Sequence, residues 1–246
     1  MSLFKKRSSS FDRRKSIVVA ENNTRVTSNG YTRLKDNVMF INADGKHKVL
    51  QVESAVAHEG KTTVVGNLAV SLGYTEKKVV VIDLDFRRPR VHRMFGLFKE
   101  QGVAEFVKGS LSEKDIIKKT EYKNVDVITR GEEVFNPALV LTSDKFKGLV
   151  EGLRNQYDYV ILDCPPILQT SDYIHISKVA DGVLLVVAHA KTTKSQLKES
   201  VAELKKNDID ILGSLFTMTE KRSNKSYYHM YSDDYYAIDT EEKTED

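Results

Sequence analysis

Apolar runs alternate with amphipathic stretches through the middle of the chain. The apolar runs predict strands at residues 48–56, 77–85, 125–130, 157–163, 182–190 and 210–218. Apolar residues spaced three and four apart predict helices at residues 31–41, 61–74, 142–157, 172–180 and 193–207. Strands that alternate with helices predict an α/β fold, in which a parallel sheet is covered by helices on both faces.

The two ends of the chain differ from this middle part. Residues 1–30 are polar and basic with weak periodicity, which predicts a flexible N-terminal arm. Residues 31–220 carry the alternating pattern and are predicted to form one domain. Residues 221–246 are predicted to be a flexible acidic tail, and five of the ten residues from Tyr227 to Tyr236 are tyrosine. The chain holds 11 tyrosines in all, so their concentration in a tail requires an explanation.

Composition excludes several classes of protein. Hydrophobic residues make up 40% of the 246 residues and charged residues 30%, which is typical of a globular core. The net charge of +3 is too small to indicate a nucleic-acid partner, and none is predicted. The single cysteine, Cys164, excludes an internal disulfide and fits a reducing compartment. No apolar run approaches 20 residues, so no membrane span is predicted, and the basic start lacks the apolar region of a secretory signal.

The turn between the first long strand and the next helix carries a phosphate-binding pattern. Residues 55–62, AVAHEGKT, match G-x-x-x-x-G-K-[ST] except that Ala55 replaces the first glycine. Gly60 allows close backbone approach, Lys61 supplies positive charge and Thr62 supplies a hydroxyl for Mg²⁺. The following helix directs its positive end at the phosphates. We therefore predict a nucleoside triphosphate with Mg²⁺, bound by Ala57, His58, Glu59, Gly60, Lys61, Thr62 and Thr63.

Two of the predicted strands end in aspartate. Asp83 and Asp85 lie in DLDFRRPR, and Asp163 begins DCPP. One such aspartate could simply cap the next helix. Three of them, at the carboxyl ends of two strands of a phosphate-binding sheet, indicate instead that they handle a metal and a nucleophile. Asp163 would act on the metal directly or through water, while one of the other two assists the metal and the second accepts a proton from an acceptor hydroxyl.

Four motifs in this order, AVAHEGKT, DLDFR, DCPP and YYHMYSDDYY, resemble those of the bacterial protein tyrosine kinases that accompany capsular and exopolysaccharide synthesis. The resemblance covers roughly residues 29–236, and residues 135–167 look like the family throughout. It implies a P-loop NTPase-like sheet of the deviant Walker type, which is shared with partitioning ATPases.

The resemblance also implies an activity and a role for each motif residue. The activity is an ATP-dependent protein tyrosine kinase that phosphorylates its own tail in neighbouring subunits. By position, Lys61 would bind the β- and γ-phosphates and Thr62 would ligate Mg²⁺. Asp85 and Asp163 would assist the metal, and Asp83 would be the base for the tyrosine hydroxyl. The implied phosphoacceptors are Tyr227, Tyr228, Tyr231, Tyr235 and Tyr236.

Partners and location follow from the same resemblance. Family members of this size are activated by the cytoplasmic tail of a separate membrane protein, a polysaccharide co-polymerase. The protein is therefore expected to be cytoplasmic and to reach the membrane through that partner. Other copies of the chain and a tyrosine phosphatase are the further expected partners.

The chain departs from the family pattern at two places. The family motif Glu-x-x-Arg-x-x-Arg, which supports ring assembly, is represented here by Asn29, Thr32 and Lys35. Bidentate arginine pairing is lost at these positions, which leaves ring formation open. Thr217 stands where the family has an asparagine that helps to hold adenine.

Two other functions remain compatible with the sequence. The first is a partitioning or cell-division switch ATPase, although such proteins carry lysine as the second residue of the phosphate loop and this chain has Val56. The second is a nucleotide-binding scaffold without kinase activity, which the substitutions at Ala55 and Thr217 keep open. Neither His58 nor Cys164 is predicted to be catalytic, because a loop residue that offers its amide and a small space-filling side chain explain them.

Overall fold

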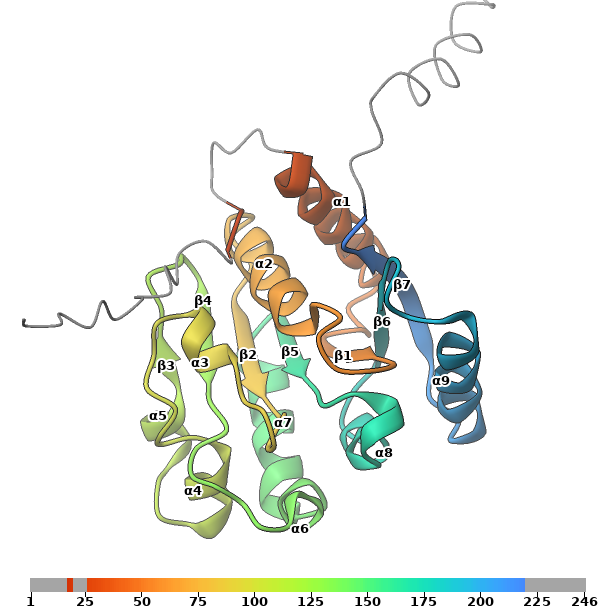
Figure 1. The fold of residues 1–246 in the computed structure, drawn as a ribbon. Coiled ribbons are helices and arrows are strands. Elements are labelled where there is room, and N and C mark those ends of the chain that lie inside the picture. Colours follow the sequence, from red (N-terminus) through yellow and green to blue (C-terminus); the bar gives the residue numbers. More distant parts are fainter. Residues whose placement is uncertain (1–16, 20–25, 220–246) are drawn as a thin grey trace, which may run out of the picture.

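The computed structural model describes residues 17–19 and 26–219, which form a sheet with helices on both faces (Figure 1). The sheet has seven strands in the order β3-β4-β2-β5-β1-β6-β7. All neighbouring strands pair in parallel except β3, which is antiparallel to β4. The strands are β1 Val49–Ser54, β2 Val79–Asp83, β3 Lys118–Lys119, β4 Val125–Ile128, β5 Tyr159–Asp163, β6 Gly182–Ala188 and β7 Ile211–Thr217. The α/β prediction is confirmed.

Helices cover the two faces of the sheet separately. The helices are α1 Val26–Ile41, α2 Lys61–Gly73, α3 Val91–Met94, α4 Val103–Lys108, α5 Glu113–Ile116, α6 Pro137–Leu141, α7 Asp144–Gln156, α8 Asp172–Ser177 and α9 Lys194–Lys206, with a 3-10 turn η2 at Ile167–Gln169. Figure 1 shows α1 and α2 in front of the central strands and α7 behind them. Leu68 of α2 packs with Ile161 on one face, and Phe146 of α7 packs with Leu162 on the other.

The central strands explain the continuous apolar runs in the sequence. Every residue of β2 and β5 is buried, because each strand lies between two neighbours and is covered on both faces. The carboxyl ends of β1, β2 and β5 lie side by side, since β5 pairs with both of the others. The topology therefore brings the phosphate loop and both aspartate motifs to one edge of the sheet.

The N-terminal boundary differs from the predicted one. Helix α1 begins at Val26, before the expected start of the domain at residue 31. Ile17 and Val19 are buried in the same core cluster as residues of α1 and α2. The Asn67 Oδ1 atom accepts hydrogen bonds from the amides of Val18 and Val19, at 2.8 and 3.2 Å. Part of the predicted arm therefore belongs to the domain, while the predicted tail at 221–246 lies outside the described residues.

The stretch between β2 and α7 contains elements that the pattern did not predict. These are the short helices α3, α4, α5 and α6 and the two-residue strand β3. Helices of four to six residues are too short to show a 3.6-residue period, so local capping decides them. Ser112 illustrates this, because it forms a capping box with Asp115 at the start of α5. In the described part of the chain, no helix combines the length and apolar character needed to span a bilayer.

Candidate active site

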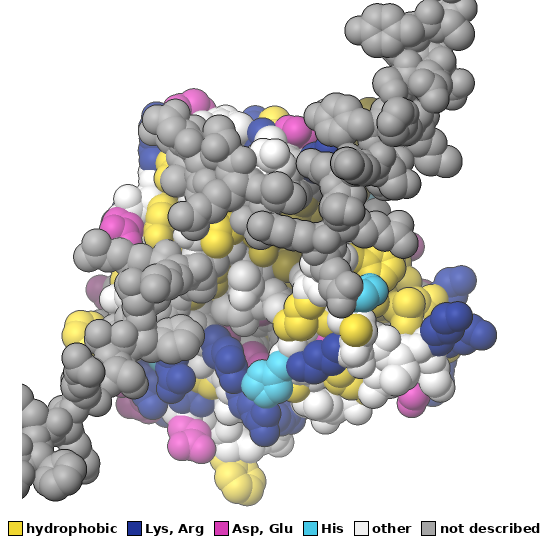
Figure 2. Space-filling view, turned by 45° about the horizontal axis from the view of Figure 1, so that its top comes forward, with side chains coloured by type: hydrophobic (Ala, Val, Ile, Leu, Met, Phe, Trp, Pro, Cys, Tyr) yellow, Lys and Arg dark blue, Asp and Glu magenta, His cyan; other side chains and the backbone are white. Residues whose placement is uncertain are grey.

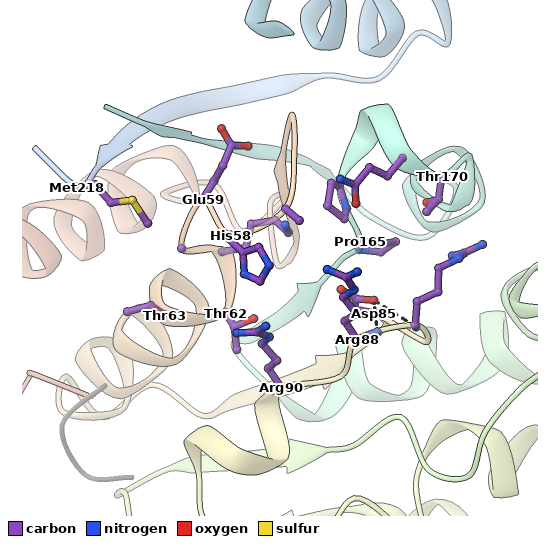
Figure 3. A pocket seen from close by; sticks show the side chains of 16 residues that line it. His58, Glu59, Thr62, Thr63, Asp85, Arg88, Arg90, Pro165, Thr170 and Met218 are labelled. Atoms are coloured by element: carbon purple, nitrogen blue, oxygen red, sulfur yellow. Dashed lines mark hydrogen bonds between the residues drawn. The ribbon is translucent and has the colours of Figure 1, made fainter. Parts of the chain in front are cut away.

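A cavity of about 500 Å³ opens at the carboxyl ends of the central strands (Figure 3). Its walls come from the phosphate loop, the turn after β2, the turn after β5 and the end of β7. The cavity is lined by Ala57, His58, Glu59, Gly60, Lys61, Thr62, Thr63, Asp85, Arg87, Arg88, Arg90, Pro165, Pro166, Gln169, Thr170 and Met218. All seven residues predicted to bind the nucleotide line it.

The phosphate loop turns sharply into helix α2. Gly60 caps the helix with φ of 91°, a left-handed conformation that favours glycine, and His58 also has a positive φ of 65°. Lys61 is the first residue of α2, and its side chain is only 8% exposed. The Nζ atom of Lys61 donates to the Ser54 Oγ atom at 2.9 Å. The amine is thus held beside the loop, where phosphate oxygens would approach.

Residues far along the chain hold the loop in place. The Glu59 side chain is fully buried, and its carboxylate accepts a hydrogen bond from the hydroxyl of Thr192. The Thr217 hydroxyl donates to the Glu59 carbonyl at 2.7 Å. The Nζ atom of Lys191 donates to the His58 carbonyl at 2.8 Å. The connection after β6 and the end of β7 therefore brace the phosphate loop.

Asp83 and Asp163, which we call the aspartate pair, are register partners on β2 and β5 and are both buried. The Oδ2 atom of Asp83 accepts the amides of Arg90 and Val91, each at 3.1 Å. The Oδ2 atom of Asp163 accepts the hydroxyl of Thr62 at 2.7 Å. Each remaining Oδ1 atom is buried and has no hydrogen-bond partner among the described residues. Two unpaired carboxylate oxygens thus lie close to the phosphate loop.

Both carboxyl groups of the aspartate pair have raised pKa values. Burial raises the pKa of Asp163 to about 6, even though the Thr62 hydroxyl and the Lys61 amine oppose the rise. Burial, followed by repulsion from Asp163, raises the pKa of Asp83 well above its usual range. Two such carboxyl groups would favour a proton or a metal cation between them.

Asp85 differs from the aspartate pair because it reaches the cavity. It is partly exposed and lines the wall, whereas neither Asp83 nor Asp163 does. The Oδ1 atom of Asp85 accepts the amides of Arg87 and Arg88, at 3.2 and 2.8 Å. The structure therefore brings the three predicted aspartates to the same edge of the sheet. Of the three, only Asp85 is open to a molecule in the cavity.

The oxygen atoms at this edge suit Mg²⁺. Among the described residues, no group of three or more His, Cys, Asp or Glu side chains forms a metal-binding cluster. Mg²⁺ does not need such a cluster, because it keeps several waters and takes oxygens from the bound phosphates. The hydroxyl of Thr62 and the carboxylate of Asp85 line the cavity, and Asp163, which accepts that hydroxyl, would act on the ion directly or through water. The residues present therefore fit the ion.

Cys164 and Arg87 have mainly structural contacts. Cys164 is buried, its thiol donates to the Leu162 carbonyl at 3.5 Å, and burial raises its pKa well above the usual value. It does not line the cavity, in agreement with a space-filling side chain. The Arg87 guanidinium donates to the buried carboxylate of Asp172 at the start of α8. This ion pair ties the turn after β2 to the neighbouring helix.

Comparisons with known proteins agree with this geometry. Residues 48–214 match the family described as AAA domain. The tyrosine-protein kinase YwqD of Bacillus subtilis is 33% identical over 231 residues, which cover 94% of this chain and 96% of YwqD. The crystal structure of the chimerical protein CapA2B2 has a TM-score of 0.80 and 28% identity, and the match covers 84% of this chain and 91% of that chain.

A more distant structure supports the fold assignment. The septum site-determining protein MinD from Pyrococcus horikoshii, complexed with Mg-ADP, has a TM-score of 0.59 at 23% identity and covers 69% of this chain and 70% of that chain. That likeness shows the shared fold and no more. The sequence match to YwqD is closer and extends over nearly the whole length of both chains. This chain therefore belongs to the family of bacterial tyrosine-protein kinases.

Proposed function

We propose that this kinase transfers the γ-phosphoryl group of Mg·ATP to tyrosines in the C-terminal tail of a neighbouring copy. The observation that carries the proposal is the single cavity in which the phosphate loop and the open carboxylate of Asp85 meet, with the aspartate pair behind them. The tail supplies five candidate acceptors within ten residues. The expected consequence is regulation of capsular or exopolysaccharide synthesis and export.

The chain's own residues would position the reactants. Lys61 and the amides of the phosphate loop would hold the β- and γ-phosphates, and Thr62 and Asp163 would hold Mg²⁺. The bound ion would neutralise charge on the transferring phosphates. In the transfer, a bond forms between the tyrosine oxygen and the γ-phosphorus while the bond to the ADP oxygen breaks. The phenol proton passes to a carboxylate, which needs only modest strength because a phenol is more acidic than an aliphatic alcohol.

The two aspartates after β2 differ in their access to the cavity. The sequence predicts Asp83 as the base and Asp85 as a metal ligand. Asp83 is fully buried, its Oδ2 atom accepts two backbone amides, and it does not line the cavity. Asp85 lines the wall of the cavity and can contact a tyrosine there. We therefore propose the reverse assignment, with Asp85 as the proton acceptor and Asp83 as the partner of Asp163 at the metal.

The end of β7 is the expected boundary of the adenine site. The Thr217 hydroxyl donates to the carbonyl of Glu59, so it supports the phosphate loop and is not available to bind adenine. The next residue, Met218, lines the cavity and is 57% exposed. We propose that Met218 packs against the adenine ring, because a flexible thioether adapts well to an aromatic surface.

Partners are proposed on the basis of the family. The cytoplasmic tail of a membrane-bound polysaccharide co-polymerase would activate the kinase and hold it at the membrane, and a tyrosine phosphatase would reverse the modification. Activity in trans requires contact between copies, whether in a ring or in a smaller assembly. Phosphates on the tail would each add roughly −1.5 to −2 charge. Repulsion between phosphorylated tails would then favour disassembly.

The first test is phosphate mapping by intact-mass and tryptic mass spectrometry. Purified full-length protein is incubated with Mg·ATP, beside a variant in which all five tail tyrosines are replaced by phenylalanine. We expect phosphate on the residues from 227 to 236 of the wild-type chain and almost none on the variant. If ATP were hydrolysed while every tyrosine stayed bare, even with a co-polymerase tail added, a switch ATPase would replace the kinase. Binding without turnover would favour a scaffold.

Nucleotide binding should depend on pH through the aspartate pair. The pKa of Asp163 is raised to about 6, so acid adds a proton that the cation must displace. We expect the affinity for Mg·ATP to fall as pH drops below about 6, by about tenfold per pH unit for each proton released. Calorimetry in buffers of different ionisation enthalpy counts those protons. An affinity that stays flat between pH 7 and 5 would contradict the metal role of the pair.

A further inference from the structure

Basic side chains outnumber acidic ones on the wall of the cavity. Lys61, Arg87, Arg88 and Arg90 line it, whereas its acidic side chains are Glu59 and Asp85. The carboxylate of Glu59 is committed to the hydroxyl of Thr192. Figure 2 shows Lys and Arg side chains gathered beside a histidine around a hollow on this face.

Two of the four cationic side chains already have partners within the protein. The Lys61 amine is held by Ser54 and is placed to meet phosphates, and the guanidinium of Arg87 is paired with Asp172. Arg88 and Arg90 are exposed, and their side chains have no hydrogen bond or ion pair with any described residue. Two exposed arginines on the wall of a cavity are therefore available to a ligand.

Arg88 lies beside the proposed proton acceptor, while Arg90 lies next to Thr62 on the side of the phosphate loop (Figure 3). The Arg88 amide donates to the Oδ1 atom of Asp85 at 2.8 Å, so both side chains leave the same tight turn. In Figure 3, Arg88 lies with Asp85 and Thr170 on one side of the cavity, and Met218 lies on the opposite side. A tyrosine that gives its proton to Asp85 would bring its sequence neighbours to the side of Arg88. The positive field also reaches His58, whose pKa is lowered chiefly by Arg90.

The chain beyond the described residues supplies a ligand of the opposite charge. The segment from Tyr227 to Asp246 holds seven acidic residues and one lysine. Asp233 and Asp234 directly precede Tyr235, and only Ser232 separates them from Tyr231. Each of these tyrosines thus has two carboxylates within three residues.

We propose that Arg88 and Arg90 select acceptor tyrosines flanked by acidic residues, by binding Asp233 and Asp234 in the tail of a second copy. This inference rests on the proposed function and names the substrate class of the same site. Guanidinium groups pair with carboxylates in fixed, often bidentate geometry, which gives direction as well as attraction. Such pairs at a partly exposed site contribute more to specificity and encounter rate than to affinity.

The test measures phosphorylation between two full-length chains. The acceptor carries Lys61→Met, so it cannot phosphorylate itself, and its tail is either native or Asp233→Asn/Asp234→Asn. The enzyme is wild type or Arg88→Glu/Arg90→Glu, with its own five tail tyrosines changed to phenylalanine. We expect the arginine variant to lower kcat/KM for the native acceptor about tenfold and to change kcat/KM for the Asp→Asn acceptor far less.

The combinations of variants distinguish direct pairing from general damage. The Asp→Asn acceptor should react poorly with wild-type enzyme and no worse with the arginine variant, because the same interaction is already lost. An Asp233→Lys/Asp234→Lys acceptor should regain activity with the arginine variant. Lys198→Glu/Lys205→Glu on α9 is the matched control, since it makes the same charge change at exposed sites that do not line the cavity. It should leave the preference for the native acceptor intact.

Two results would overturn the inference. A raised KM for ATP with an unchanged preference between the acceptors would mean that the arginines bind nucleotide. Equal rates for native and Asp→Asn acceptors with wild-type enzyme would mean that the enzyme does not recognise the acidic residues. Absence of phosphotyrosine in the wild-type pair is a different failure, because it would remove the proposed function and this inference together.

Discussion

Replacing Lys61 by methionine is expected to lower tail phosphorylation about 1,000-fold while the protein stays folded. The Nζ atom of Lys61 is the buried cation nearest the phosphate loop, and phosphoryl transfer depends on charge stabilisation at the β- and γ-phosphates. Methionine keeps a similar length and apolar stem, and it removes only the charge and the donor. Ser54 keeps its own hydrogen bond to the Val56 carbonyl, at 2.8 Å. The measurement is the rate of phosphotyrosine formation at saturating Mg·ATP.

Lys191→Met provides the matched control for this prediction. Lys191 also contacts the phosphate loop, but from outside, through the carbonyl of His58, and it does not line the cavity. Its loss should reduce the rate less than about fivefold, since one exposed hydrogen bond is removed and no phosphate contact. Circular dichroism checks that both variants fold. Equal rates for the two variants would show that Lys61 does not act on the transferred phosphate.

The sequence predicts the parts of this site that are local in the chain. Gly60, Lys61 and Thr62 share one turn, and Asp163 ends a buried strand, so their positions follow from the strand pattern alone. Parallel strands place their carboxyl ends at one edge, which is why motifs about 100 residues apart meet. The hydroxyl of Thr62 indeed lies 2.7 Å from the Oδ2 atom of Asp163.

Contacts between distant polar residues could not be predicted in this way. Nothing near Thr192 or Thr217 indicates that they brace Glu59, because polar residues in connections usually face water. The same limit applies to Asp83 and Asp85. Both follow an apolar strand, and only the fold of the turn decides that Asp83 binds the amides of Arg90 and Val91. The different environments of Asp83 and Asp85 therefore became visible only in the structure.

Asp83→Asn is expected to stabilise the nucleotide-free protein and to lower its kinase activity at least about 100-fold. A carboxyl group with a raised folded pKa makes its favourable contribution at low pH, and that contribution is lost as pH rises through the folded pKa. At pH 7.5 the aspartate pair therefore lowers the free energy of unfolding. Asparagine keeps an oxygen for the amides of Arg90 and Val91, and its NH₂ group can donate to the unpaired oxygen of Asp163.

The expected gain is about 1–2 kcal/mol, which corresponds to a rise in Tm of about 2–8 °C for a domain of this size. Asp126→Asn is the matched control, because Asp126 is a buried aspartate at the same sheet that is satisfied by Lys119 and by the hydroxyl of Tyr157. That variant should lose stability, since it removes a paired charge. The gain for Asp83→Asn should shrink as pH falls toward 4, where the native pair is protonated. A variant that was destabilised at pH 7.5 would show that Asp83 is not part of a destabilising carboxylate pair, and one that kept its activity would show that Asp83 is not part of the metal site.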